Sequence, residues 1–225
     1  WVPRVSRARA CLAQREIQAL LAIVAVGVVY RFGTMGHFPP TNGFSSIEET
    51  QRATTALAVL NGSRPWEWPL AIYLNAAVFS VFGASIWAIR VPVMIFGCLT
   101  LFAFYGLARR MVSAPAALFA TALVAVSRWH VQVSWYNEDV YTPLFPFVVA
   151  LYLTVRTRSD PRPSYYVLLG AICGYTLYDY AGFRGTFAVV GGFFAIDALW
   201  QRAWPKDGKL IALTFAVAAM LAAPL

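Results

Sequence analysis

The sequence predicts an all-α, polytopic helical membrane protein, with about seven transmembrane helices and a long first outer loop. Hydrophobic residues make up 60% of the 225 residues and charged residues only 12%, which leaves too little polar surface for a water-soluble globule of this size. The apolar residues form continuous runs, whereas a membrane β-barrel would show short alternating segments. The ionisable residues also sort into two sets at opposite ends of these runs.

The apolar runs place seven spans along the chain. They cover residues 17–32, 86–108, 114–134, 140–157, 164–180, 184–201 and 210–225. Most reach or approach the roughly 20 residues that a helix needs to cross a bilayer. The first run follows an Arg-rich end, as a signal peptide would, but no small-residue cleavage site comes after it. We therefore interpret it as a retained anchor. Residues 1–225 form a single transmembrane domain, which we expect to be the amino-terminal part of a longer chain.

The charge distribution predicts which end of each span faces the cytoplasm. With the first end inside, twelve basic residues lie inside with only four acidic ones, as the positive-inside rule requires. The inner basic residues are Arg4, Arg7, Arg9, Arg15, Arg109, Arg110, Arg156, Arg158, Arg162, Arg202, Lys206 and Lys209. The opposite face is balanced, with Arg31, Arg52, Arg64, Arg90, Arg128 and Arg184 against Glu48, Glu49, Glu67, Glu138, Asp139 and Asp179. Because this pattern explains the net charge of +8, we expect no nucleic-acid partner.

The first outer loop, residues 31–85, is much longer than an ordinary connection and is expected to carry interfacial helices. Residues 69–83 are apolar but too short for a span, and counting them as one would move the next basic clusters outside. We therefore predict a helix at the outer interface, with Trp66 and Trp68 at headgroup level.

A second helix is expected earlier in this loop. Ser45 or Ser46 would cap it, Glu48 and Glu49 would lie in its first turn, and it would end near Asn61-Gly62.

Carboxylates in three outer turns are the candidate chemistry. Glu48 and Glu49 lie in the first loop, Glu138 and Asp139 begin the fourth span, and Asp179 ends the fifth. A carboxylate within hydrogen-bond reach of a hydroxyl can act as its general base. Each of them could equally be an ordinary solvated loop charge.

Two arginines and one histidine are the candidate cationic groups. Arg128 and Arg184 lie at the outer ends of spans, where guanidinium groups could hold a lipid-linked phosphate, although arginines there can also simply reach towards headgroups. His130 lies in an aromatic stretch and is more often a packed polar residue than a ligand in such a place. A metal site is undecided: Glu138 and Asp139 could bind a divalent ion, but no ligand motif is present.

The order of several short motifs resembles a known family. They are Ser46-Ile47-Glu48-Glu49, Pro69-Leu70, Phe82-Gly83-Ala84-Ser85, Arg90-Val91-Pro92, Tyr105-Gly106-Leu107-Ala108-Arg109-Arg110, Ser127-Arg128-Trp129-His130 and Tyr175-Thr176-Leu177-Tyr178-Asp179-Tyr180 with Arg184. From about residue 17 to 200, the chain resembles the polytopic glycosyltransferases of the GT-C fold. It is most similar to the protein mannosyltransferase and aminoarabinose transferase branch, glycosyltransferase family 39-like.

The resemblance implies transfer of a sugar from a polyprenyl-phosphate donor to a protein or glycolipid acceptor on the extracytoplasmic face, by inverting direct displacement. The family's first-loop Asp-Glu pair is implied as the catalytic site. It corresponds to Glu48 and Glu49, with Glu48 in the place of the usual Asp. Another departure is Trp135, where relatives often have Arg.

The same resemblance suggests roles for the remaining candidates. Arg184 and Arg128 would neutralise the departing phosphate. Glu138, Asp139, His130, Tyr178, Asp179 and Tyr180 would contact the substrates. The short cytoplasmic loops favour the bacterial inner membrane, and an endoplasmic reticulum protein would show the same charge bias.

Two other functions stay open. A secondary transporter would also place charged residues within helical spans, although it would concentrate them near the bilayer midplane. A non-catalytic membrane scaffold could keep the same fold without turnover. Binding of a lipid-linked sugar would separate the enzyme from the transporter, and turnover would separate it from the scaffold.

Overall fold

The computed structural model describes residues 4–33, 47–65, 69–137, 144–178, 181–201 and 207–223, and all regular elements in these ranges are helical. The elements are α1 (Arg4–Gly33), α2 (Ile47–Leu60), α3 (Pro69–Phe82), α4 (Ile86–Met111), α5 (Ala114–Val126), α6 (Arg128–Val133), α7 (Leu144–Thr157), α8 (Pro163–Thr176), the 3-10 helix η1 (Ala181–Arg184), α9 (Gly185–Gln201) and α10 (Gly208–Ala222). The expected all-α fold is confirmed.

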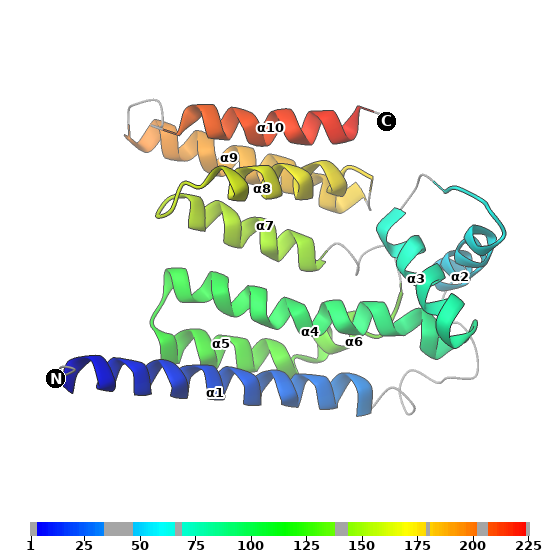
Figure 1. Cartoon of the computed structure of the whole chain (residues 1–225), viewed down its shortest axis with the longest axis horizontal. Helices are drawn as coiled ribbons and strands as arrows, with labels where there is room; N and C mark the ends of the chain where they lie inside the picture. Colours follow the sequence, from blue (N-terminus) through cyan, green and yellow to red (C-terminus); the bar gives the residue numbers. More distant parts are fainter. Residues whose placement is uncertain are drawn as a thin grey trace.

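The long helices form a bundle along the longest axis of the molecule (Figure 1). Contacts join α1 to α5, α5 to α4, α4 to α7, α7 to α8 and α8 to α10, so these helices follow one another across the bundle in this order. Helices α2 and α3 lie beyond one end of it, which we call the α2 end (Figure 1). They contact each other, and α3 contacts the start of α4.

Three helices of the described part are long and apolar enough to cross a membrane: Leu12–Gly33, Ile86–Met111 and Gly182–Trp200. Shorter apolar helices are Leu70–Phe82, Ala114–Val126, Leu144–Thr157 and Gly208–Ala222. Large apolar side chains stay exposed on several of these helices, for example Phe119 on α5 and Leu199 on α9. Together these features fit the helical membrane protein that the composition predicts.

The span expected over residues 114–134 is interrupted, which corrects the sequence prediction. Ser127 leaves the helical conformation, with φ −57° and ψ 121°, and separates α5 from α6. Its N–H bonds to the carbonyl of Val124 and its own carbonyl accepts the N–H of Val131, so Ser127 closes one helix and opens the next.

Both expected first-loop helices are present. Helix α2 ends at Leu60, and Gly62 adopts φ +92°, a conformation that glycine takes without steric cost. Helix α3 ends before Gly83, which has φ +76°. The Oγ of Ser85 then accepts the N–H of Ala88 and caps α4. The expected capping residues of α2, Ser45 and Ser46, lie outside the described residues, and how α3 sits against a membrane stays a prediction.

Basic side chains gather at the end of the bundle opposite to α2, which we call the basic end. Arg109 and Arg110 lie in the last turn of α4, and Arg156 lies in the last turn of α7, two residues before Arg158. Arg110 donates a hydrogen bond to the Oγ of Ser159 at 2.7 Å and so ties α4 to the turn between α7 and α8. The predicted clusters at 109–110 and 156–158 therefore meet at one end, and the side of the membrane that this end faces stays a prediction.

Helices α8 and α10 approach each other closely. A Cβ atom added at Gly170 would lie 2.4 Å from the carbonyl oxygen of Thr214, and one added at Gly174 would lie 3.0 Å from that of Ala218. The Oγ1 of Thr214 donates to the carbonyl of Tyr166 at 3.1 Å. Small residues that let two helix backbones meet are typical of packing between membrane helices.

Candidate active site

Glu48 and Glu49, the two carboxylates in the first turn of α2, have opposite environments. Glu48 is exposed, whereas Glu49 is fully buried. The Nε of Arg90 donates to one oxygen of Glu49 at 2.8 Å, and the Nη2 donates to the other at 2.9 Å. Arg90 is itself fully buried near the start of α4, so this bidentate pair joins α2 to α4 away from solvent.

Small apolar residues allow α2 to come close enough for this ion pair. Ala53 and Ala56, one and two turns after Glu49, face α3 and α4, where they pack in a cluster with Ala76, Phe79, Ala88 and Ile89. Ala56 has no exposed surface. The spacing of Glu49, Ala53 and Ala56 keeps them on one helix face, whereas Glu48 is turned away from it.

A second buried polar contact fixes the next turn of α2. The Nη1 of Arg52 donates to the Oδ1 of Asn137 at 2.8 Å. The Nδ2 of Asn137 donates to the Oδ1 of Asn75 at 2.9 Å, and also to the carbonyl of Ile89. The side chain of Asn137 thus connects α2, α3 and α4. The guanidinium of Arg90 lies 5.8 Å from the ring centre of the neighbouring Tyr136.

The buried ion pair limits what Glu49 can do chemically. Both of its oxygens accept hydrogen bonds from Arg90, and its side chain has no exposed area. Removing one member of such a pair leaves an uncompensated buried charge, which costs about 3–5 kcal/mol. This arrangement suits a residue that holds α2 in place. Of the two neighbouring glutamates, only Glu48 is exposed.

His130 belongs to another buried cluster, around Arg31 at the end of α1. The Nη1 of Arg31 donates to the carbonyls of Gly27 at 2.8 Å and Ala125 at 3.3 Å, and its Nη2 contacts the Nδ1 of His130. Its Nε donates to the Oγ of Ser134 at 3.2 Å. His130 is 5% exposed and joins α1 to α6 in this structure. Its expected substrate contact stays a prediction.

Trp135, the residue that departs from the family pattern, closes the same cluster. Its indole N–H donates to the carbonyl of Arg31 at 3.1 Å. Gly97 on α4 makes room for the cluster, since an added Cβ would lie 2.2 Å from the Oγ of Ser134. The cluster therefore depends on a glycine that faces it from α4.

The expected phosphate-binding arginines are both exposed. Arg128 is the first residue of α6, and Arg184 is the last residue of η1, directly before α9. In Figure 1, α6 and the start of α9 lie in the half of the molecule that carries α2.

Tyr178, beyond the last turn of α8, donates to the carbonyl of Leu221 at 2.7 Å and links α8 to α10.

The other expected substrate residues, Glu138, Asp139, Asp179 and Tyr180, lie outside the described residues. Within the described ranges, no group of three or more His, Cys, Asp or Glu side chains is arranged to hold a metal ion. Whether Glu138 and Asp139 bind a divalent ion stays a prediction.

The buried arginines are the part of the site that sequence reasoning missed. Arg31, Arg52 and Arg90 were counted among the outer basic residues, and each is at most 1% exposed. One signal of buried ion pairs was available in the sequence. The predicted outer face carries six basic and six acidic residues in mainly apolar surroundings. Charges there are expected to be paired when they are buried, but the sequence does not say which ones are buried.

Comparison with known proteins identifies the family. The family model described as dolichyl-phosphate-mannose-protein mannosyltransferase matches residues 63–225, which takes in α3 to α10 and therefore Arg90, Arg128 and Arg184. Helix α2, with Glu48 and Glu49, precedes the matched stretch. No curated protein and no solved structure matches the chain. Because the match spans well over half of its residues, the chain belongs to the dolichyl-phosphate-mannose-protein mannosyltransferase family, and it is a membrane glycosyltransferase of the GT-C type.

Proposed function

We propose that this protein transfers a sugar from a polyprenyl-phosphate carrier to a hydroxyl of a protein or glycolipid acceptor, on the extracytoplasmic side of a bacterial inner membrane. The observation that carries the proposal is the contrast within the first turn of α2, where Glu48 is exposed beside a Glu49 that is buried and paired. The family description names a mannosyl donor, so mannose is the first sugar to test.

Glu48 is the general base in this proposal. Its exposure lets an acceptor hydroxyl approach, and the neighbouring Glu49–Arg90 ion pair fixes the backbone from which Glu48 projects. As a carboxylate, Glu48 takes the proton of the hydroxyl while the oxygen attacks the anomeric carbon from the face opposite to the phosphate. General-base catalysis of this kind contributes about 10²–10⁴-fold to the rate.

Arg184 and Arg128 stabilise the leaving group. The bond between the anomeric carbon and the phosphate oxygen breaks, and the phosphate keeps the electron pair as a negative charge. Two exposed guanidinium groups, one at the start of α6 and one directly before α9, are suited to neutralise this charge. The product sugar then has the inverted anomeric configuration, because a single displacement has taken place.

Glu138 and Asp139 directly follow Asn137, whose side chain contacts α2 and α3. This placement supports a role for one of them in orienting the acceptor or in binding a divalent ion. Tyr178, Asp179 and Tyr180 precede η1 and Arg184, which suits contacts with the sugar or the first prenyl units.

The proposal is tested in membrane vesicles that contain the full-length protein and radiolabelled polyprenyl-phosphate sugars. Wild type is compared with Glu48→Gln and Arg184→Ala. Arg64→Ala is the matched control, because Arg64 is an exposed arginine of the segment between α2 and α3 to which no role is assigned. We expect label on the acceptor with wild type and Arg64→Ala, and little or none with the other two variants.

Each contrary outcome points to a different function. Label that accumulates inside the vesicles without transfer would support a transporter, which family membership already disfavours. Binding of donor without turnover for every sugar would support a non-catalytic scaffold. Full transfer by Glu48→Gln would refute Glu48 as the base.

A further inference from the structure

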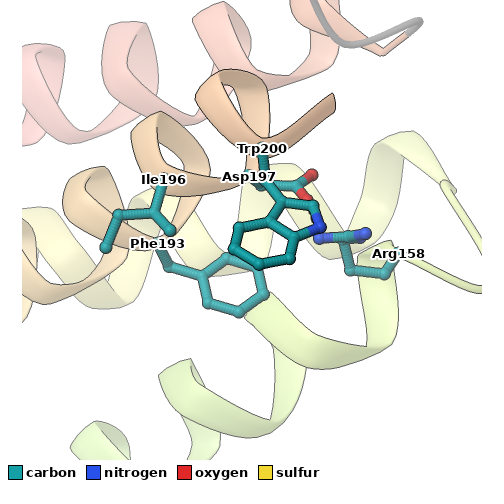
Figure 2. Close-up of a pocket in the computed structure, with 5 residues that line it drawn as sticks. All are labelled: Arg158, Phe193, Ile196, Asp197 and Trp200. Carbon is teal, nitrogen blue, oxygen red and sulfur yellow. The ribbon is translucent and has the colours of Figure 1, made fainter. Parts of the chain in front are cut away.

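A pocket at the basic end combines a charged pair with exposed aromatic and aliphatic surface. Phe193, Ile196, Asp197 and Trp200 line it from α9, and Arg158 lines it from the turn after α7 (Figure 2). Its volume is about 250 Å³. The four α9 residues follow one another at spacings of three, one and three, so they share one face over the last two turns of the helix.

The pocket lies where an apolar span ends. The candidate membrane span of α9 runs from Gly182 to Trp200, so its last residue is the pocket's tryptophan. Trp200 is 87% exposed and Ile196 is 66% exposed. An exposed tryptophan at the end of an apolar span is typical of the level of the lipid headgroups, and an exposed isoleucine one turn earlier is suited to contact acyl chains.

The pocket contains both signs of charge next to this apolar surface. Arg158 pairs with Asp197, and its guanidinium lies 6.0 Å from the ring centre of Phe193. The Arg158 side chain is 45% exposed and that of Asp197 is 10% exposed, so donors of the arginine remain open to the pocket mouth. The Trp200 indole lines the same pocket (Figure 2). Two kinds of N–H donor and a carboxylate therefore line one pocket.

We propose that this pocket binds one phospholipid whose headgroup carries a primary ammonium, as in phosphatidylethanolamine. The phosphate accepts hydrogen bonds from Arg158 and the Trp200 indole, and the ammonium donates to Asp197. The glycerol and the first acyl carbons lie against Ile196 and Trp200. The phosphate and the ammonium of this headgroup match the cation and the anion of the Arg158–Asp197 pair. Phosphatidylglycerol offers no cation to Asp197, and the choline headgroup has no N–H to donate.

This site is separate from the proposed active site. It lies at the basic end, whereas α2, which carries Glu48, lies at the opposite end of the bundle (Figure 1). Lipid binding in this pocket therefore does not depend on the proposed sugar transfer.

Native mass spectrometry of the delipidated full chain in detergent tests the proposal directly. The protein is titrated with phosphatidylethanolamine, phosphatidylcholine, phosphatidylglycerol and a polyprenyl phosphate of matched purity. We expect one tight phosphatidylethanolamine per chain, bound about tenfold more tightly than the other two phospholipids, the effect of one charge-assisted hydrogen bond. Equal binding of the three phospholipids, or preferred binding of polyprenyl phosphate, would overturn the proposal.

Two variants separate the two halves of the pocket. Asp197→Asn should reduce phosphatidylethanolamine binding to the level of phosphatidylcholine and leave phosphatidylcholine unchanged. Trp200→Ala should weaken both, and because Trp200 is 87% exposed this variant keeps the fold. Trp129→Ala is the matched control, since Trp129 is 66% exposed on α6, away from the pocket. Unchanged phosphatidylethanolamine binding in Trp200→Ala, or an equal loss in Trp129→Ala, would also refute the site.

Discussion

Two helix contacts in this molecule are held together in different ways. Where α2 meets α4, the central contact is a buried ion pair between Glu49 and Arg90. Where α8 meets α10, Gly170 lets the backbones approach so closely that a Cβ would lie 2.4 Å from a carbonyl oxygen. The first contact depends on matching charges and the second on matching shapes. Loss of one member of a buried ion pair costs more folding free energy than a small misfit of packed side chains. The contact between α2 and α4 should therefore be more sensitive to substitution than the contact between α8 and α10.

The difference also separates the site from its scaffold. The polar contacts of Arg52, Asn137 and Asn75 surround the segment that carries Glu48. The apolar core formed by α7 to α10 contains residues such as Leu169, Val190 and Ala218, to which we assign no chemistry. Directional polar bonds hold a helix in one orientation, which the role proposed for Glu48 requires, whereas apolar packing tolerates small shifts.

Breaking the ion pair should have the largest effect. Arg90→Met removes the guanidinium that pairs with the buried Glu49 and should lower the free energy of unfolding by about 3–5 kcal/mol. Unfolding in mixed dodecyl maltoside and SDS micelles measures this change. The double variant Glu49→Leu/Arg90→Met should be more stable than Arg90→Met alone, because no charge then remains unpaired.

If the double variant were as unstable as Arg90→Met, the ion pair would not be the source of the loss. The shape of the Arg90 side chain would then be the feature that α2 depends on.

Filling the close contact between α8 and α10 should have an intermediate effect. Gly170→Ala places a methyl group against the backbone of Thr214 and should destabilise by about 1–3 kcal/mol. The control is Gly192→Ala on α9, because a Cβ there meets nothing within 4 Å. That variant should be neutral or slightly stabilising, since alanine favours the helix by about 0.5–1 kcal/mol. Equal effects of the two substitutions in the same unfolding assay would contradict the close packing.

Removing a single hydrogen bond from the same contact should have the smallest effect. Thr214→Val keeps the shape of the side chain and loses the bond from its Oγ1 to the carbonyl of Tyr166. Hydrogen bonds between membrane helices contribute about 0.6 kcal/mol on average, so we expect a loss of that order. A loss as large as that of Gly170→Ala would mean that the bond, and not the shape, dominates the contact.

The helices were predictable because their signals are local. The Gly62 turn ends α2 close to the expected residue, and the break at Gly83 separates α3 from α4 as expected. The interruption at Ser127 was missed because residues 114–134 are apolar enough to read as one span, and a serine within such a run is a weak signal. The bundle end shared by Arg110 and Arg158 was predicted from charge alone.

The site was predictable only in part. The sequence indicated the acidic pair, but it could not distinguish Glu48 from Glu49, because their difference arises from the side of α2 that packs against α4. Arg90 lies 41 positions after Glu49, so their pairing is a tertiary contact without a local signal. The burial of Arg31 with His130 likewise depends on the packing of α1 against α6.

A comparison of Glu48→Gln with Glu49→Gln in the same preparation, for sugar transfer and for unfolding, tests most directly which glutamate is the base. We expect Glu48→Gln to lose about 100-fold or more of the transfer rate with an unchanged free energy of unfolding, because it removes an exposed base. Glu49→Gln should instead lose stability, because Arg90 is left buried without a negative partner. Normal transfer by Glu48→Gln, or a stable but inactive Glu49→Gln, would contradict the assignment of Glu48 as the base and Glu49 as the residue that holds α2.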